Sequence, residues 1–330
     1  MGGTKTRVAL FDNHFNLVED FKFRTPKTRQ QFTSALTKSV RKLLEKAASQ
    51  KLEVSAVGLG LAGSVDSRRG ILKSAPNIPC LKRFSFKKTL VHLCHCDIVL
   101  LNDVQAALYG ELKLGKAVGH NDVIAIFIGT GISGAVAIDG NLHFGASLQA
   151  GNIGHYLVHA IGPLAGSERH GILDDFASRT AIAGAAATFA AKNWAPYLLK
   201  TVGTDVRQIK SSTLVDAIRA GDKSIEELVR SRIRIVGIVL SNMVDFLNPE
   251  MIVLGGGLTD SMSRIVRHEV IAGIHNHSVP AARRVLRVVT SKHKQNAVTI
   301  GAARFAVDSI NASAARVDKP ARQRIQRRAA

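Results

Sequence analysis

A chain of 330 residues with 46% hydrophobic and 21% charged residues has the composition of a globular protein, and its length allows two domains. Three cysteines are too few for a disulfide framework and favour a reducing, cytoplasmic setting. No charged segment followed by an apolar run opens the chain, and no apolar run reaches the length of a membrane span. We therefore expect neither a secretory signal nor a membrane partner.

The net charge of +20 would attract polyanions in general and specifies none of them. Part of it lies near the C-terminus, where "ARVDKPARQRIQRRAA" has no apolar period. We therefore predict that residues 312–330 form a basic, disordered tail. Aromatic residues make up only 5%, and no helix-turn-helix segment fits before the first motif, so specific binding of nucleic acid is not expected.

The N-terminal third of the chain predicts alternating strands and helices. Gly2-Gly3-Thr4-Lys5 indicates a loop, and a turn at Asp12-Asn13 ends the strand that follows. The apolar pattern predicts strands at Thr6–Phe11, Ser55–Leu61 and Asp97–Leu101, and helices at Thr28–Gln50 and from Val104 to Gly115.

The second half of the chain begins with "DVIAIFIGTGISGAVAIDGNL", which predicts a strand, a glycine turn, a second strand and an Asp-Gly turn. Later residues are more helical, with an alanine-rich stretch at Ala177–Leu199 and an amphipathic helix at Ile225–Leu247. The apolar strand of "MIVLGGGL" follows. Strands that alternate with helices indicate an α/β chain with mostly parallel sheets.

Two segments share one design. "GGTKTRVALFD" and "IGTGISGAVAIDG" each place Gly-Thr in a turn, continue as a strand and end it with Asp12 or Asp139. Two such segments indicate a duplicated fold that binds phosphate through the backbone N–H groups of its glycine turns. Gly255-Gly256-Gly257, between a strand and a helix, would be a third anion site. A plain hairpin remains the alternative for either turn alone.

The same segments, taken in order, resemble the motifs of the ROK family of sugar kinases and related repressors. The matching stretches are "GGTKTRVALFD", "GLGLAGSVDSRRG", "APNIP", "LNDVQAALYGE", "IGTGISGAVAIDGNLHFGASLQAGNIGH" and "VLGGGL". The resemblance implies the actin-like ATPase (ribonuclease H-like) fold, with two α/β domains and a cleft between them. It implies domains at 1–118, completed by a helix near 297–311, and at 119–296.

The resemblance also implies a reaction, the transfer of the γ-phosphoryl group of ATP, with Mg²⁺, to a hexose hydroxyl, as in a glucokinase. Asp103 matches the general base, and open α/β sheets place ligands at such strand ends. Capping of the next helix by Asn102-Asp103 is the structural alternative. A homo-oligomer is implied by resemblance only.

The remaining site residues are assigned by resemblance. Asparagine amides both donate and accept hydrogen bonds, which suits a polyol. The sugar-binding residues implied are Gly63, Asn77, Asn102, Asn152, His155 and Asp174. The nucleotide-binding residues implied are Gly2, Gly3, Thr4, Lys5, Gly129, Thr130, Gly131, Gly255, Gly256 and Gly257.

The sequence departs from the family pattern at several places. The leading strand, with its Asp before Gly-Gly-Thr, is missing, so either the protein starts upstream of Met1, which we favour, or it is truncated. Asn152 and Asp174 stand where the family has Glu. Three zinc-motif cysteines are replaced by Ala165, Ser167 and Ile172, so we predict no zinc and no other metal ligand set.

Three interpretations of function stay open. The first is the hexose kinase, which we favour. The second is a catalytically impaired ROK protein that binds sugar or regulates. The third, less favoured, is a kinase that uses polyphosphate or another polyanion as donor. Cys94 and Cys96 in "VHLCHCDI" suggest metal ligands, but free thiols beside a strand are the favoured interpretation.

Overall fold

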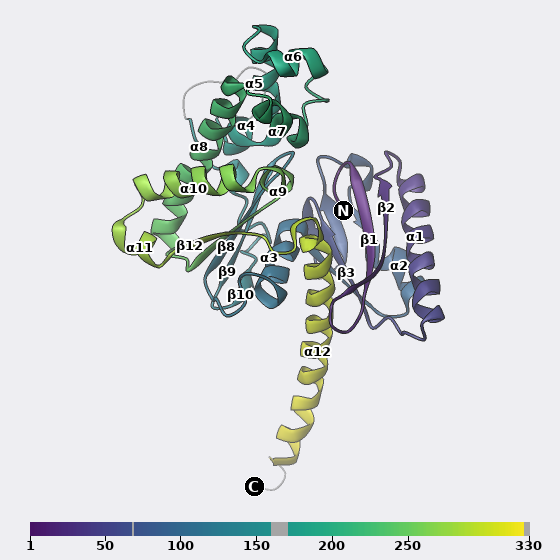
Figure 1. Cartoon of the computed structure of the whole chain (residues 1–330). Coiled ribbons are helices and arrows are strands. Elements are labelled where there is room, and N and C mark those ends of the chain that lie inside the picture. Colours follow the sequence, from purple (N-terminus) through teal and green to yellow (C-terminus); the bar gives the residue numbers. More distant parts are fainter. Residues whose placement is uncertain (68, 160–170, 327–330) are drawn as a thin grey trace. The chain divides into compact units, whose positions relative to one another are not determined.

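The computed structural model describes residues 1–67, 69–159 and 171–326. They divide into two compact units. Unit 1 contains Met1–Lys113 and the chain from Asn296 onward, and unit 2 contains Leu114–Gln295 (Figure 1).

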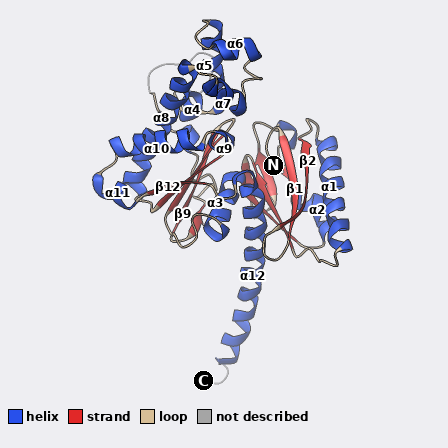
Figure 2. Ribbon diagram, in the orientation of Figure 1, coloured by secondary structure: helices blue, strands red, loops and turns tan. Residues whose placement is uncertain are grey.

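Unit 1 is an α/β layer structure whose strands do not join into one sheet (Figure 2). β1 (Lys5–Phe11) pairs antiparallel with β2 (Leu17–Arg24), and β3 (Ala56–Leu61) pairs parallel with β7 (Asp97–Asn102). A small antiparallel sheet consists of β4 (Ser64–Asp66), β5 (Ile71–Ser74) and β6 (Phe84–Ser85). The helices are α1 (Arg29–Ser49), α2 (Phe86–Cys94), α3 (Asp103–Leu114) and α12 (Ala297–Gln326), with a 3-10 turn η1 at Pro79–Leu81.

Local sequence explains how these helices cover the strands. The Thr28 hydroxyl accepts a hydrogen bond from the N–H of Gln31 and caps α1. Apolar residues then recur every three to four positions and form the buried face that contains Phe32 and Leu36. On β3, a Cβ at Gly58 would lie 1.9 Å from the carbonyl oxygen of Ala302, so glycine allows α12 to pack directly on the strand. Figure 1 shows α1 and α12 on opposite sides of the strands of unit 1.

Unit 2 contains one continuous sheet with the order β10-β9-β8-β11-β12. Its strands are β8 (Val123–Ile128), β9 (Ile132–Ile138), β10 (Asn141–His143), β11 (Met251–Gly255) and β12 (Arg287–Thr290). Its helices are α4 (Leu173–Ala177), α5 (Arg179–Ala191), α6 (Pro196–Val202), α7 (Ser211–Arg219), α8 (Lys223–Leu247), α9 (Gly257–Ser261), α10 (Ser263–His277) and α11 (Pro280–Val285). Two 3-10 turns, η2 (Ile153–His155) and η3 (Lys294–Asn296), complete the elements, and η3 leads into α12.

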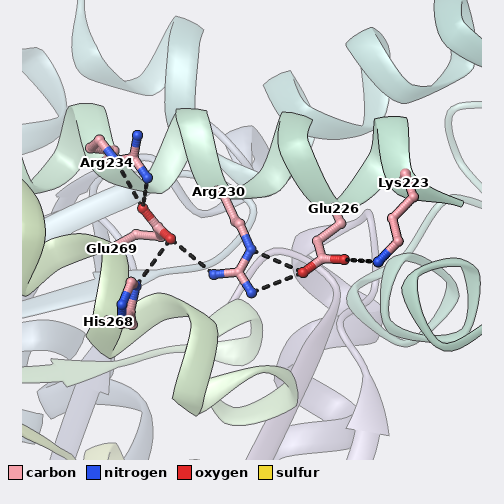
Figure 3. A network of polar contacts seen from close by, with 6 residues as sticks. All are labelled: Lys223, Glu226, Arg230, Arg234, His268 and Glu269. Atoms are coloured by element: carbon pink, nitrogen blue, oxygen red, sulfur yellow. Dashed lines mark hydrogen bonds and ion pairs between the residues drawn. The ribbon is translucent and has the colours of Figure 1, made fainter. Parts of the chain in front are cut away.

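The helices α8 and α10 are held together by close packing and by ion pairs. A Cβ at Gly273 would lie 2.7 Å from the carbonyl oxygen of Arg234, so the two helix backbones approach closely. Figure 3 shows the buried carboxylate of Glu269 on α10, which accepts hydrogen bonds from Arg230 and Arg234 on α8. Arg230 also pairs with Glu226 one turn earlier.

Several expectations from the sequence need correction. Sheets that are mostly parallel were expected, but five of the eight strand pairs in the described residues are antiparallel, because glycine and Asx turns make hairpins. The alanine-rich stretch is helical, as expected, and contains two helices: Ser178 caps α5, and Asn193 with positive φ and Pro196 separate α5 from α6.

The C-terminal residues also differ from expectation. α12 continues to Gln326, through most of the stretch that the sequence led us to expect without regular structure. Ala, Arg and Gln are the commonest residues of that stretch and have high intrinsic helix propensity, which does not depend on an apolar period. No helix among the described residues is long and apolar enough to cross a membrane.

Candidate active site

The first glycine loop is fixed to the end of β2. The N–H of Gly2 donates to the carbonyl of Lys5 (3.1 Å), and the carbonyl of Gly2 accepts from the hydroxyl of Thr25 (2.8 Å). Thr25 also donates its N–H to the carbonyl of Thr4 (3.0 Å), while the side chains of Thr4 and Lys5 are exposed. Thr25 was not among the predicted residues, because its contact with the loop depends on the pairing of β1 with β2.

The same loop contacts a predicted sugar-binding residue. A Cβ at Gly3 would lie 2.6 Å from the Cβ of Asn77, so only glycine allows the two backbones to approach this closely. The structure therefore brings together, within unit 1, a residue predicted to bind nucleotide and a residue predicted to bind sugar. Asn77 is exposed beside this contact.

The junction of β7 and α3 holds Asn102 and Asp103. The side-chain oxygen of Asn102 accepts from the N–H of Val104 (2.9 Å), and its amide donates to the carbonyl of Gly63 (3.2 Å). Gly63 has φ +145°, and a Cβ there would lie 2.3 Å from the carbonyl of Ser74. Three predicted residues, Gly63, Asn102 and Asp103, thus lie together at the start of α3.

Asp103 also accepts from the N–H of Val104 (3.0 Å), so the capping alternative is present in the geometry. Asn102 contributes the shorter of these two bonds, so capping of α3 does not depend on Asp103 alone. Burial raises the pKa of the Asp103 carboxyl above its usual range, and the positive amino group of Met1 opposes that rise. The junction therefore combines a fixed amide with a carboxylate of raised pKa.

The second glycine turn, in unit 2, is tied to the start of α5. The N–H of Gly129 donates to the carbonyl of Gly131 (2.8 Å), and the carbonyl of Gly129 accepts from the N–H of Arg179 (2.9 Å). The hydroxyl of Thr180 donates to the carbonyl of Thr130 (2.8 Å). Sequence reasoning missed Arg179 and Thr180. The only sequence signal was the capping hydroxyl of Ser178, which marks the helix start and not what it contacts.

Asp174 is a neighbour of this second turn. Its carboxylate accepts a hydrogen bond from the N–H of Ile132, and a Cβ at Gly131 would lie 3.1 Å from it. A Cβ at Gly154 would lie 2.8 Å from the same carboxylate. Asp174 therefore joins the turn to η2, whose flanking residue Asn152 and last residue His155 are exposed.

The three-glycine segment lies directly against the strand that precedes the second turn. A Cβ at Gly255 would lie 2.6 Å from the ring of Phe127, and one at Gly256 would lie 2.5 Å from the carbonyl of Ile128. Gly256 has φ +91°, a conformation that favours glycine, whereas Gly257 faces open space. Unit 2 thus brings two predicted nucleotide-binding segments together, at the ends of β8 and β11.

Only some of the residues considered as possible metal ligands, or as their replacements, lie within the described residues. Ala165 and Ser167 lie outside the described residues, so the absence of zinc stays a prediction. Ile172 forms a bridge with Leu157. Among the described residues, no group of three or more His, Cys, Asp or Glu side chains is arranged to hold a metal ion. Burial, together with Cys96, raises the pKa of Cys94 to about 11, which disfavours the thiolate that binds metals.

The two units define the class of the protein. Unit 2 has the sheet order β10-β9-β8-β11-β12 with a glycine turn between β8 and β9, and unit 1 repeats the turn and the hairpin. This is the architecture of the actin-like ATPase fold. The family model described as "ROK family" matches residues 1–309, and the chain belongs to the ROK family.

Individual relatives agree with this assignment. The N-acetylgalactosamine kinase AgaK of Shewanella sp. (strain ANA-3) is 28% identical over 79% of this chain and 80% of its own length. The glucokinase of Streptomyces coelicolor is 29% identical over 79% of this chain and 81% of its own length. The crystal structure of a ROK family glucokinase from Streptomyces griseus in complex with glucose and AMPPNP has a TM-score of 0.79 and 28% identity, and the match covers 93% of this chain and 97% of that chain.

Proposed function

We propose that the protein is an ATP-dependent hexose kinase of the glucokinase type. Family membership and the sugar kinases among its relatives support this proposal. The observation that carries it is the β7–α3 junction, where Asn102 caps the helix and Asp103 supplies a partly buried carboxylate with a raised pKa.

In the proposed reaction Asp103 is the general base. Its carboxylate takes the proton of the attacking sugar hydroxyl, the hydroxyl oxygen bonds to the γ-phosphorus, and the bond to the β-phosphate oxygen breaks, so that the electron pair leaves with ADP. A raised pKa makes the ionised carboxylate a stronger base. Mg²⁺ bound to ATP would offset the negative charge of the phosphates during transfer.

The glycine segments would hold the nucleotide. Backbone N–H groups at Gly2-Gly3-Thr4-Lys5 and Gly129-Thr130-Gly131 can approach phosphate oxygens because no Cβ intervenes. The contact of Gly255 and Gly256 with the end of β8 supports a shared role with the second turn.

The sugar would be held by Gly63, Asn77, Asn102, Asn152, His155 and Asp174. The amide of Asn102 is fixed by Gly63, which supports a directional contact with a sugar hydroxyl. Asn152 lacks the charge of a carboxylate, so we expect sugar binding weaker by roughly 1–2 kcal/mol than with Glu at this position. The Asn152→Glu variant tests this expectation.

The decisive experiment measures ADP release from Mg-ATP with glucose, mannose, fructose, allose and N-acetylhexosamines. Asp103→Asn should abolish sugar-dependent release. Asp97→Asn, at the exposed start of the same strand, is the matched control and should leave it intact. Sugar binding by calorimetry without any release would favour the regulatory protein instead. Release with polyphosphate but not ATP, lost at high salt, would favour the polyanion donor.

We also propose a cytoplasmic homo-oligomer. The three cysteines are free in the structure, which suits a reducing compartment that supplies ATP. The oligomer is supported only by the resemblance to the family, and sedimentation velocity would measure it.

A further inference from the structure

The two glycine turns differ in where their positive charge comes from. The first turn, Gly2-Gly3-Thr4-Lys5, contains its own cation, and the side chain of Lys5 is exposed. The second turn, Gly129-Thr130-Gly131, leads into β9 without a basic residue. The guanidinium of Arg179, the first residue of α5, lies beside this second turn, because its Nη2 donates to the hydroxyl of Thr130 (3.5 Å). Only the fold therefore gives the second turn a positive charge.

The backbone of Arg179 is fixed to the turn, whereas its side chain keeps most of its hydrogen-bond donors. Its N–H donates to the carbonyl of Gly129 (2.9 Å). A guanidinium has five N–H groups. This one makes two contacts, both long and both to neutral acceptors, namely the hydroxyl of Thr130 and the carbonyl of Ile209 (3.4 Å). It forms no ion pair with a carboxylate among the described residues, so these residues leave its charge unneutralised.

The position of Arg179 in α5 is unfavourable for a cation. Arg179 follows the capping residue Ser178, and the first turn of the helix contains no acidic residue. The N–H groups at the start of a helix carry partial positive charge, which disfavours a basic side chain there. Local conflicts of this kind are expected at functional sites. An anion bound at the second glycine turn would supply the missing compensation.

The carboxylate of Asp174 does not take this part. It lies beside Gly131 and accepts a hydrogen bond from the N–H of Ile132, whereas Arg179 lies beside Thr130. Thr130 is exposed, and its hydroxyl can still donate its own proton while it accepts from Arg179. Arg179 and Thr130 therefore offer adjacent donors to one anion.

We propose that Arg179 is a phosphate-binding residue, whose guanidinium donates to oxygens of the phosphate groups of the donor beside the hydroxyl of Thr130. The planar fork of guanidinium N–H groups matches phosphate oxygens in pairs, which a lysine ammonium does not. This inference rests on the proposed function, because it adds a residue to the site of the phosphate donor. It extends that function, since none of the nucleotide-binding residues predicted in unit 2 carries a charge.

The test measures the binding of ADP, adenosine and inorganic tripolyphosphate by calorimetry in the presence of Mg²⁺. Arg179→Met removes the charge and keeps an unbranched side chain. We expect it to weaken binding of ADP and tripolyphosphate by about 10- to 100-fold, as for the loss of a charge-assisted hydrogen bond, and to leave adenosine binding unchanged. Arg179→Lys should weaken both less, because it keeps the charge and loses only the fork.

The matched control is Arg219→Met. Arg219 is exposed at the end of α7, and Ile209 lies before the start of that helix. Its loss changes the net charge by the same amount and should leave the affinity for all three compounds unchanged.

A second measurement uses the unchanged protein and does not depend on the folding of a variant. Phenylglyoxal modifies guanidinium groups, and mass spectrometry gives the rates at Arg179 and Arg219. Tripolyphosphate at ten times its dissociation constant should slow modification of Arg179 roughly tenfold and leave that of Arg219 unchanged.

The other outcomes overturn the inference. If Arg179→Met weakens adenosine and ADP binding by the same factor and lowers the unfolding midpoint, Arg179 is a structural link between the second turn and Ile209. Unchanged tripolyphosphate affinity in Arg179→Met, or modification of Arg179 that tripolyphosphate does not slow, would also reject a phosphate-binding role.

Failure of the proposed kinase is distinguishable from failure of this inference. Binding of ADP that depends on Arg179, without sugar-dependent ADP release, would keep the phosphate site and reject the kinase. Sugar-dependent release that is lost in Asp103→Asn but is unaffected by Arg179→Met would keep the kinase and reject the role of Arg179. Binding of neither ADP nor tripolyphosphate by the unchanged protein would reject both.

Discussion

The sheets of the two units differ in continuity, although both are introduced by the same glycine-turn design. In unit 2, four of the five residues from Val123 to Phe127 on β8 and all of β11 are buried. In unit 1, the first four residues of β3 keep intermediate exposure, and no strand in the described residues lies between β3 and β1. The comparison teaches that the turn motif specifies the hairpin that follows it, but does not specify how deeply the parallel strands of the unit are buried.

The largest expected effect is a loss of catalysis, and it concerns Asp103 in unit 1. Asp103→Asn should lower kcat by about 10²–10⁴-fold, because the general base is lost while the cap at Asn102 remains. In the unchanged protein, kcat should fall as the pH is lowered through the raised pKa of Asp103, since protonation removes the base. Steady-state kinetics across pH measures both effects.

The corresponding control for that variant is thermal unfolding. A midpoint that falls together with kcat would show that Asp103 acts mainly as a structural cap. A kcat that does not change would contradict the assignment of the base.

A matched pair of leucines tests the burial difference directly. Leu254 on β11 is fully buried, whereas Leu59 on β3 is only partly buried and lines a cavity within unit 1. Leu254→Ala should lower the free energy of unfolding of unit 2 by about 3–4 kcal/mol, and Leu59→Ala that of unit 1 by about 1–2 kcal/mol. Urea unfolding combined with hydrogen exchange in each unit gives the two values. Equal losses would break the comparison, because β3 would then be as well buried as β11.

The carboxylate beside the second turn should have a structural effect. Asp174→Asn replaces a charged acceptor of the Ile132 N–H by a neutral one, so we expect a loss of about 1–3 kcal/mol in the stability of unit 2. Asp139→Asn is the control, because Asp139 is exposed and asparagine tolerates its positive φ. Similar unfolding midpoints for the two variants would count against this role of Asp174.

The smallest expected effect lies in the helix layer of unit 2. Burial raises the pKa of Glu269, but hydrogen bonds from Arg230, Arg234 and His268 outweigh it and hold the pKa below its usual range (Figure 3). Because the folded-state pKa is lowered, the stabilisation is present above the unfolded-state pKa and is lost as the pH falls through the folded-state value. Glu269→Gln should therefore cost about 1–2 kcal/mol at pH 7.

The pH dependence distinguishes this charge effect from packing. The difference between the unchanged protein and Glu269→Gln should shrink as the pH falls below about 4.5, close to the unperturbed value of a glutamate. Glu227→Gln, exposed on α8, should show no difference at any pH. A difference in stability between the unchanged protein and Glu269→Gln that does not change with pH would mean that Glu269 stabilises unit 2 through packing and not through its charge.

Short-range patterns gave correct positions for many elements of this protein. The strand that ends at Asn102, the helix capped by Thr28 and the strand before Gly255 all lie where the sequence predicted them, within one or two residues. β2 was not predicted, because Glu19 and Asp20 are adjacent and interrupt its alternation of polar and apolar residues. The family and its fold were also predicted, since ordered motifs over most of the chain are specific together.

By itself the sequence determined the glycine turns, the capped helix starts and the family, because these depend on residues adjacent in the chain. Only the tertiary structure decided that Gly3 contacts Asn77, that Asp174 contacts Gly131, and that β1 pairs with β2 while β3 pairs with β7. Such contacts join residues distant in sequence, and their free energy comes from close packing and burial, which no local pattern of residues specifies.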